Sequence, residues 1–261
     1  MKVKIFLIIL CSLNYALLGG VEDSTDARKL FKDVDATMVI SDAEGKPVFL
    51  YNEERANRRY LPASTFKIPN SIIGLETKII SDTNQIIKWD GIKRDITEWN
   101  RDHNLPSALK YSVVPYYQEF ARHVGAEKYL DYLTKMNYGN KVIGNRVDYF
   151  WLDNSLQITA FEQIDFLKKF LHYQLPFEKN NIEIVKNILS VRSYDKSTIK
   201  YKTGTGKIND TSYVAWLVGI IEHENQSYLF AFNCSGKSFA EVSKIRNSLP
   251  YAVIEKVIIG K

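Results

Sequence analysis

The chain has 261 residues and a formal net charge of +5, from 35 basic and 30 acidic side chains. Hydrophobic residues make up 45% of the chain and charged residues 25%, as in an ordinary packed globular protein. This composition excludes a disordered chain, a collagen and a coiled-coil rod, and the single long apolar run excludes a protein with several membrane spans. The length fits one large domain or two small ones, with a core that needs neither a disulfide nor a metal for stability.

Residues 1–20 predict a secretory signal peptide. Lys2 and Lys4 form a basic start, and the uncharged run 5–18 follows. As a helix this run reaches about 21 Å, which is short of the roughly 30 Å hydrocarbon core of a bilayer. The pattern favours cleavage within residues 16–20 over retention as an anchor. We therefore expect a periplasmic or secreted protein with no stable membrane insertion.

Removal of the signal peptide changes both the charge and the cysteine count. The remaining chain carries +3 and has no basic arm, so no nucleic-acid partner is expected. Cys11 leaves with the signal, and Cys234 stays alone in an apolar run that predicts a buried strand cysteine. An exported chain without a disulfide fits a bacterial envelope.

The mature chain has two β-rich ends and a helical middle. Alternating and β-branched runs separated by turn residues predict five strands, at residues 36–42, 47–52, 197–204, 212–222 and 226–233. Apolar spacing of three and four predicts helices at residues 64–78, 114–124, 127–136, 161–173, 177–189 and 239–259.

This order predicts one α+β domain over residues 21–261, with an α/β sandwich-like arrangement. The five strands form an antiparallel sheet built from both chain ends, and an all-helical subdomain is inserted between them. A cleft between the two parts is the default location for a site.

Ser64 and Lys67 form the strongest chemical signal. They lie one turn apart at the predicted start of a helix, where backbone N–H groups favour developing negative charge. A serine hydroxyl becomes a nucleophile only beside a base. A lysine supplies that base when burial lowers the pKa of its amine. Ser-x-x-Lys alone is common by chance, so the pair needs support from other motifs.

Two further motifs supply that support through their order. Ser112 opens a predicted helix, 48 residues after Ser64, and Lys202-Thr203-Gly204 lies 90 residues later on a strand expected to end in a glycine turn. Taken singly, Ser112 is equally well an N-cap and Lys202 an edge-strand lysine. As an ordered set, however, they are typical of penicillin-recognising serine enzymes.

The chain resembles the class D (oxacillinase-type) serine β-lactamases over essentially its whole mature length. The matching motifs, in order, are STFK at 64–67, SVV at 112–114, YGN at 138–140, WLDNSLQIT at 151–159 and KTG at 202–204. The resemblance implies a β-lactamase/transpeptidase-like fold and hydrolysis of penicillin-type antibiotics, which gives antibiotic resistance. It also implies no diffusible cofactor.

The resemblance assigns the catalytic roles. Ser64 is the nucleophile, and CO₂ or bicarbonate converts Lys67 to N6-carboxylysine, the general base. Trp151 donates its indole N–H to that carbamate. Ser112 carries a proton to the leaving nitrogen, and Lys202 presents a positive charge.

The same resemblance assigns the groups that bind substrate. Backbone N–H groups of Ser64 and Thr205 form the oxyanion hole, Arg246 pairs with the substrate carboxylate, and the remaining contacts come from Val114, Thr203 and Gly204. The turn at 138–140 is structural.

Two alternatives stay open at this point. A penicillin-binding transpeptidase or a β-lactam sensor domain is also acylated, but without rapid turnover. No Ser-Asp-Asn triplet is present, which disfavours class A. The four histidines, at 103, 123, 172 and 223, show no metal-ligand spacing, so no metal is expected. A β-lactam is the expected small-molecule partner, and the chain is expected to be a monomer or homodimer.

Overall fold

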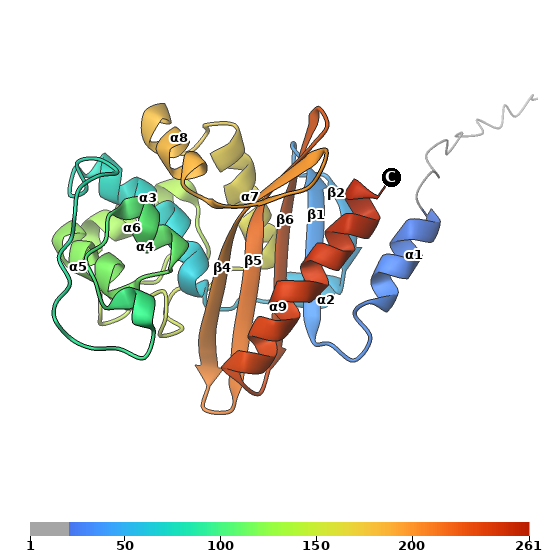
Figure 1. The fold of residues 1–261 in the computed structure, drawn as a ribbon, viewed down its shortest axis with the longest axis horizontal. Helices are drawn as coiled ribbons and strands as arrows, with labels where there is room; N and C mark the ends of the chain where they lie inside the picture. The colour runs from blue at the N-terminus through green and yellow to red at the C-terminus, as the bar shows by residue number, and fades with distance from the viewer. Residues whose placement is uncertain (1–20, 261) are drawn as a thin grey trace, which may run out of the picture.

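The computed structural model describes residues 21–260, so the predicted signal peptide lies outside the described residues (Figure 1). Its centre is one antiparallel sheet with the strand order β2-β1-β6-β5-β4-β3. The strands are β1 (Ala36–Asp42), β2 (Pro47–Tyr51), β3 (Ser190–Ser193), β4 (Ser197–Asn209), β5 (Ser212–His223) and β6 (Gln226–Gly236). The α+β class and the antiparallel sheet built from both chain ends are confirmed.

The sheet has six strands where five were predicted. The additional strand β3 is four residues long and pairs with Thr198–Tyr201 of β4 at the edge of the sheet. Its sequence, SVRS, is polar and mostly exposed, so it carries no apolar alternation. Short polar edge strands of this kind avoid pairing with other chains, and for the same reason they are hard to recognise in a sequence.

The strand that carries Lys202 is also longer than predicted. β4 continues past Gly204 to Asn209, and the chain turns only there to enter β5. The expected glycine turn after Gly204 is therefore wrong. Gly204 pairs with Trp216 in the middle of the ladder instead.

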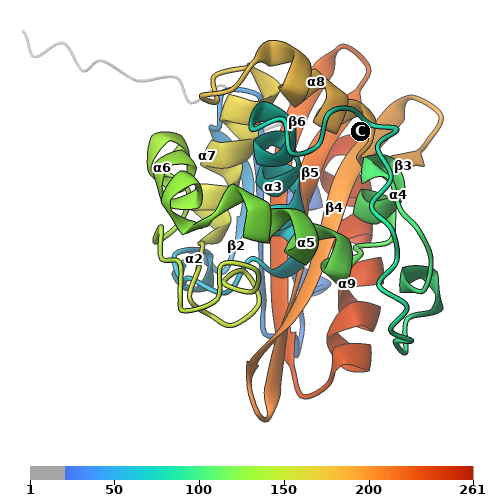
Figure 2. The same ribbon diagram turned by 90° about the vertical axis from the view of Figure 1, so that its left-hand side faces the viewer.

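Helices cover both faces of the sheet (Figures 1 and 2). The α-helices are α1 (Val21–Lys29), α2 (Glu53–Ala56), α3 (Lys67–Glu76), α4 (Leu105–Lys110), α5 (Val114–Val124), α6 (Ala126–Met136), α7 (Ala160–Leu171), α8 (Lys179–Asn187) and α9 (Phe239–Ile254). The 3₁₀ turns η1 (Ala63–Phe66) and η2 (Thr97–Trp99) and the π-helical turn η3 (Glu255–Ile259) complete them. The predicted helices are present, and α1, α2 and α4 were not predicted. No helix within residues 21–260 is long and apolar enough to cross a membrane.

Two hydrophobic cores lie on the two faces of the sheet. On β5, Trp216 and Val218 join the core beneath α3–α8, while Leu217 and Ile221 join the core beneath α1 and α9. Side chains alternate between the faces of a strand, and both faces are buried here, which explains why β5 is apolar throughout. The unpaired Cys234 is buried on β6, as predicted.

Arg55 joins α2 to strand β6 and to the residue that precedes β1. Its guanidinium, only 3% exposed, donates to Asn233 Oδ1, Asp35 Oδ2 and Ser235 Oγ, each at 2.7 Å. It also lies 4.6 Å from the ring centroid of Tyr60, which begins the segment leading to η1. One buried cation therefore joins α2, β6 and the approach to the predicted nucleophile.

We expect Arg55→Met to lower the free energy of unfolding by about 3 kcal/mol, because it leaves buried acceptors on β6 without donors. The measurement is urea-induced unfolding followed by circular dichroism. The matched control is Arg58→Met, which removes an exposed arginine paired with the exposed Glu54 and should change stability little. Equal effects of the two substitutions would show that the Arg55 contacts contribute nothing specific.

Candidate active site

Ser64 and Lys67 lie where a 3₁₀ turn passes into a helix. Ser64 belongs to η1, and Lys67 is the first residue of α3. The Lys67 Nζ lies 3.0 Å from Ser64 Oγ. The neighbouring Ala63 has φ of 47°, a left-handed conformation that is strained for alanine. Its N–H donates to the carbonyl of Trp151 at 3.1 Å, which holds the turn in place.

The amine of Lys67 is buried without a counter-ion. Lys67 is fully buried, and no carboxylate among residues 21–260 forms an ion pair with it. Its Nζ lies 5.0 Å from the ring centroid of Tyr117. Burial, with the nearby charge of Lys202, holds the pKa of Lys67 well below its ordinary value. The lowered pKa favours the neutral amine, which is the form that can accept the proton of Ser64.

Ser112 and Lys202 form a second pair. Lys202 projects from β4, is 2% exposed, and donates to Ser112 Oγ at 2.5 Å and to the Thr203 carbonyl at 2.9 Å. Burial, followed by the charge of Arg246, lowers the pKa of Lys202 to about 7. A lysine with this pKa exchanges a proton near neutrality.

The sequence predicted that Ser112 opens a helix, and this prediction is wrong. It lies between α4 and α5 with φ of 53°, and Val113 occupies the N-cap position of α5. A left-handed backbone at a serine is uncommon. Here it turns the hydroxyl toward Lys202 instead of leaving it to cap the helix, which is why the N-cap alternative is wrong.

Gly204 allows β4 to pack directly against η1. A Cβ on Gly204 would lie 2.9 Å from the Pro62 carbonyl oxygen, 3.0 Å from Thr65 N and 3.1 Å from Ser64 N. All three contacts are with backbone, so no side-chain movement can relieve them. A glycine is required at this position, and the close approach brings the N–H of Ser64 next to β4.

A hydrogen bond joins Arg246 of α9 to Thr205 of β4. An Nη of Arg246 donates to Thr205 Oγ1 at 2.6 Å. Burial lowers the pKa of Arg246, although a guanidinium stays protonated at any ordinary pH. Together with Lys202, Arg246 places positive charge along β4. Val114, at the start of α5, is half-buried beside Ser112.

Trp151 carries an unsatisfied donor. Its side chain is fully buried and stacks on Phe66, with ring centroids 5.8 Å apart. The indole Nε1 has no hydrogen-bond partner within the described chain. A buried N–H without a hydrogen-bond partner costs free energy of folding, so this donor is suited to bind an incoming acceptor.

The turn at 138–140 has a structural role, because its contacts are with the backbone at Gln157 and with the aromatic core. Gly139 has φ of 54°, and a Cβ there would lie 2.2 Å from the Gln157 carbonyl oxygen. Asn140 Oδ1 accepts from the Gln157 N–H at 2.9 Å, and Asn140 N–H donates to the Gln157 carbonyl at 2.9 Å. Tyr138 packs edge-on against Phe66.

Two residues beside Lys67 were not singled out in the sequence. Ser71 Oγ donates to the Lys67 carbonyl at 2.7 Å and lies 2.8 Å from the Tyr117 hydroxyl. Ser71 follows Lys67 by four residues, so helical periodicity was a usable signal for it. Tyr117 comes from α5, and only the packing of the two helices identifies it. Within residues 21–260 no cluster of His, Cys, Asp or Glu is arranged to hold a metal ion.

Comparison with known proteins places this geometry in a family. Residues 29–255 match the penicillin binding protein transpeptidase domain. The chain is 38% identical to the β-lactamase OXA-10 of Pseudomonas aeruginosa, covering 98% of this chain and 97% of that protein. It is 45% identical to the β-lactamase OXA-48 of Klebsiella pneumoniae, covering 71% and 69% of the two chains.

A solved structure agrees with these relatives. The fold superposes on FUS-1 (OXA-85), a class D β-lactamase from Fusobacterium nucleatum subsp. polymorphum, with a TM-score of 0.85. The two chains are 35% identical, and the match covers 91% of this chain and 99% of the other.

We expect Lys202→Met to raise stability at low pH. An unfolded lysine keeps its proton up to about pH 10.4, whereas the folded protein releases the Lys202 proton near pH 7. Between these two pKa values the unfolded state therefore binds more protons than the folded state. The free-energy cost of burying the charged Lys202 is complete below pH 7 and disappears as the pH rises toward 10. The stability advantage of Lys202→Met should shrink across the same window.

This prediction is measured by urea unfolding at pH 6 and pH 9 in bicarbonate-free buffer, so that the lysine amines stay unmodified. The control is Lys207→Met, which removes an exposed lysine whose pKa is raised by its hydrogen bond to Asp210. That substitution should not stabilise the protein at pH 6. A Lys202→Met advantage independent of pH would contradict a lowered pKa.

Proposed function

The chain belongs to the class D β-lactamases, and on that premise we propose that it opens the β-lactam ring of penicillin-type antibiotics through an acyl-enzyme at Ser64. The observation that carries the proposal is the contact of Ser64 Oγ with the buried, counter-ion-free amine of Lys67. A nucleophile beside a base of lowered pKa is what acyl transfer at neutral pH requires.

The proposed acylation uses the two lysine–serine pairs in sequence. Ser64 Oγ attacks the ring carbonyl carbon, and its proton passes to the base at Lys67. The carbon–nitrogen bond of the ring then breaks, and Ser112 protonates the leaving nitrogen. Lys202, 2.5 Å from Ser112 Oγ and with a pKa near 7, restores that proton. Water then hydrolyses the ester.

Substrate positioning follows from the elements around β4. In this proposal the backbone N–H groups of Ser64 and Thr205 stabilise the developing oxyanion; removal of one such donor typically costs 10²–10³ in rate, on the order of 3 kcal/mol. Arg246, bound to Thr205 Oγ1, supplies a guanidinium fork for the substrate carboxylate. Val114, Thr203 and Gly204 line the approach.

We further propose that Lys67 is carboxylated by CO₂. The free amine attacks carbon dioxide, forming an N–C bond and releasing one proton, so the reaction needs no other co-reactant. Two features support it: burial keeps the Lys67 amine neutral, and the orphaned Trp151 Nε1–H lacks an acceptor that a carbamate oxygen would supply. The carbamate then serves as the base for acylation and deacylation, without a diffusible cofactor.

Export and antibiotic resistance are the remaining parts of the proposal. The signal-like pattern of residues 1–20 supports export, and the similarity to the β-lactamases OXA-10 and OXA-48 supports a role in resistance. N-terminal sequencing of protein from a periplasmic or culture fraction tests the expected cleavage within residues 16–20. A protein retained whole inside the cell would contradict export.

The purified protein should hydrolyse many equivalents of benzylpenicillin. Ser64→Ala should abolish turnover and the covalent adduct, because no other hydroxyl of residues 21–260 forms a hydrogen bond with Lys67 Nζ. The control is Ser248→Ala, an exposed serine on α9, which should retain activity. Absorbance of the β-lactam and protein mass spectrometry measure both quantities. One stoichiometric adduct without turnover would favour a transpeptidase or sensor instead.

Activity lost at mildly acidic pH should return when bicarbonate is added, because protonation of the amine releases CO₂ from a carbamate. Trp151→Phe keeps the stacking on Phe66 but removes the indole donor, so this variant should need much more bicarbonate for half-maximal activity. The control is Trp89→Phe, whose exposed indole donates to the Ile92 carbonyl. A ¹³C NMR signal from labelled bicarbonate reports the carbamate itself.

We expect Lys67→Ala to lose that ¹³C signal and Trp89→Phe to retain it. An enzyme fully active without CO₂, and with no carbamate signal, would show that the unmodified amine is the base. That result would leave acylation at Ser64 intact.

A further inference from the structure

A cavity of about 850 Å³ lies between α4 and the edge of the sheet at β3. Figure 2 shows these two elements side by side, beyond the edge of β4. The walls of this cavity include Tyr111 and Tyr201, which directly precede Ser112 and Lys202 in the chain. Ser64, Lys67 and Arg246 do not line it. This α4–β3 cavity therefore borders the catalytic groups without containing them.

The α4–β3 cavity carries positive charge that nothing in the described chain balances. Arg101 and Lys110 line it, and no acidic residue does. Their charged groups lie 5.1 Å and 5.4 Å from the ring centroid of Tyr111. Neither side chain forms an ion pair with a carboxylate of residues 21–260. Both side chains are exposed, so an anion can reach them.

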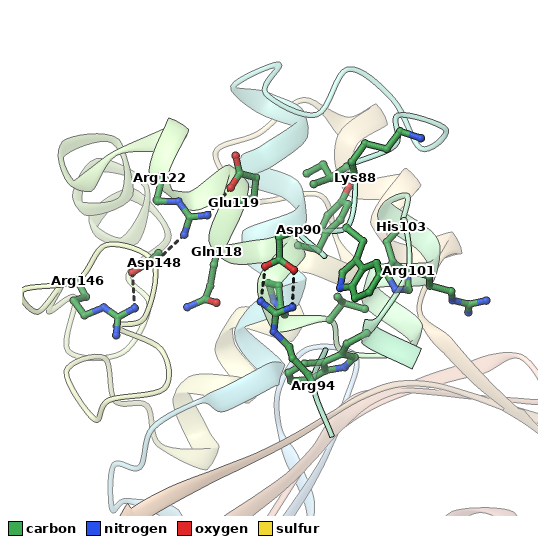
Figure 3. Close-up of a pocket in the computed structure, with 16 residues that line it drawn as sticks. Lys88, Asp90, Arg94, Arg101, His103, Gln118, Glu119, Arg122, Arg146 and Asp148 are labelled. Carbon is green, nitrogen blue, oxygen red and sulfur yellow. Dashed lines mark hydrogen bonds and ion pairs between the residues drawn. The ribbon is translucent and has the colours of Figure 1, made fainter. Parts of the chain in front are cut away.

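A neighbouring cavity of about 290 Å³ provides the contrast (Figure 3). Most of its cations are already paired; for example, Arg94 binds Asp90, and Arg122 binds both Glu119 and Asp148. Arg101 lines both cavities, and Figure 3 shows its guanidinium directed away from these pairs. Lys88 and Arg146 of the smaller cavity also have carboxylate partners, in Asp102 and Asp148. Arg101 is therefore the one lysine or arginine of that cavity without an ion pair among residues 21–260.

The remaining walls of the α4–β3 cavity are largely apolar. Pro106 of α4 faces Ile188, Leu189 and Val191 from the segment that enters and forms β3, and Tyr201 adds an aromatic surface from β4. Cavities of roughly 300–1,000 Å³ hold drug-sized molecules, and apolar walls with a few convergent polar groups are their usual composition. A guanidinium and an ammonium on one aromatic ring add recognition of a carboxylate.

We propose that the α4–β3 cavity is a second binding site for small organic carboxylates with an apolar body. The carboxylate binds between Arg101 and Lys110, and the apolar body packs against Leu189, Val191 and Tyr201. Binding requires none of the groups that react with substrate. The site is thus distinct from the position between Thr205 and Arg246 proposed for the substrate carboxylate.

The test is a ¹⁹F NMR titration of the wild-type protein with 4-(trifluoromethyl)benzoate. We expect saturable binding that Arg101→Gln/Lys110→Gln weakens at least about tenfold, or roughly 1.4 kcal/mol. The neutral probe 4-(trifluoromethyl)benzyl alcohol should bind correspondingly more weakly. Arg246→Ala should leave the affinity within about twofold, because Arg246 lies outside the cavity.

Two further variants distinguish binding in the α4–β3 cavity from nonspecific attraction and from binding at Arg246. Lys128→Gln/Lys179→Gln removes two exposed lysines elsewhere and should not affect binding; an equal loss would show nonspecific attraction to a basic protein. Val191→Trp fills the cavity while keeping both cations, and its position, 53% exposed, tolerates the change. It should abolish binding, with circular dichroism confirming the fold. Binding that survives Val191→Trp, or that disappears only in Arg246→Ala, would overturn the proposal.

Discussion

The burial of Lys67 without a carboxylate partner is the constraint on which the rest of the site depends. An ammonium in such a position is disfavoured, so burial lowers the pKa of Lys67 and favours the neutral amine. The ring centroid of Tyr117 lies 5.0 Å from the Lys67 Nζ, and Phe66, which precedes Lys67 in the chain, stacks on Trp151. All three aromatic residues belong to the larger of the two hydrophobic cores. The aromatic core therefore has a chemical role as well as a structural one, because it removes water from the amine.

A second constraint is the backbone contact at Gly204. It brings β4 against η1, and the indole of Trp216 adds a hydrogen bond to the Leu61 carbonyl at 2.9 Å from the same side. Because Lys202 is two residues away on the same strand, this contact also fixes its distance from the Ser64 turn. At that position the charge of Lys202 helps to lower the pKa of Lys67.

These features imply a cost in stability that the fold must offset elsewhere. Two buried lysines and the left-handed backbone at Ala63 and Ser112 are each unfavourable. The Arg55 contacts and the two cores on either side of the sheet provide the compensation. Unsatisfied donors at the site, such as Trp151 Nε1, fit the same pattern: the free protein keeps groups ready for partners that arrive later.

The sequence by itself determined the order of the strands and helices, the pairing of Ser64 with Lys67, and the family resemblance. The first two depend on local periodicity and on residues within one helical turn, and the resemblance depends on the order and spacing of short motifs along the chain. It did not reveal β3, which is short, polar and paired at an edge, nor the continuation of β4 beyond Gly204. The conformation of Ser112 also escaped it, because serine before a helix normally caps.

Only the tertiary structure decided which of the predicted groups share one environment. Residues 64, 112, 202 and 246 meet because η1, the α4–α5 link, β4 and α9 pack together, and long-range packing leaves no periodic trace in a sequence. Within residues 21–260, the same packing keeps carboxylates away from Lys67 and leaves Arg101 and Lys110 without ion pairs. Charge composition records how many ionic groups a chain has, whereas their pKa values and partners depend on burial, which the fold alone sets.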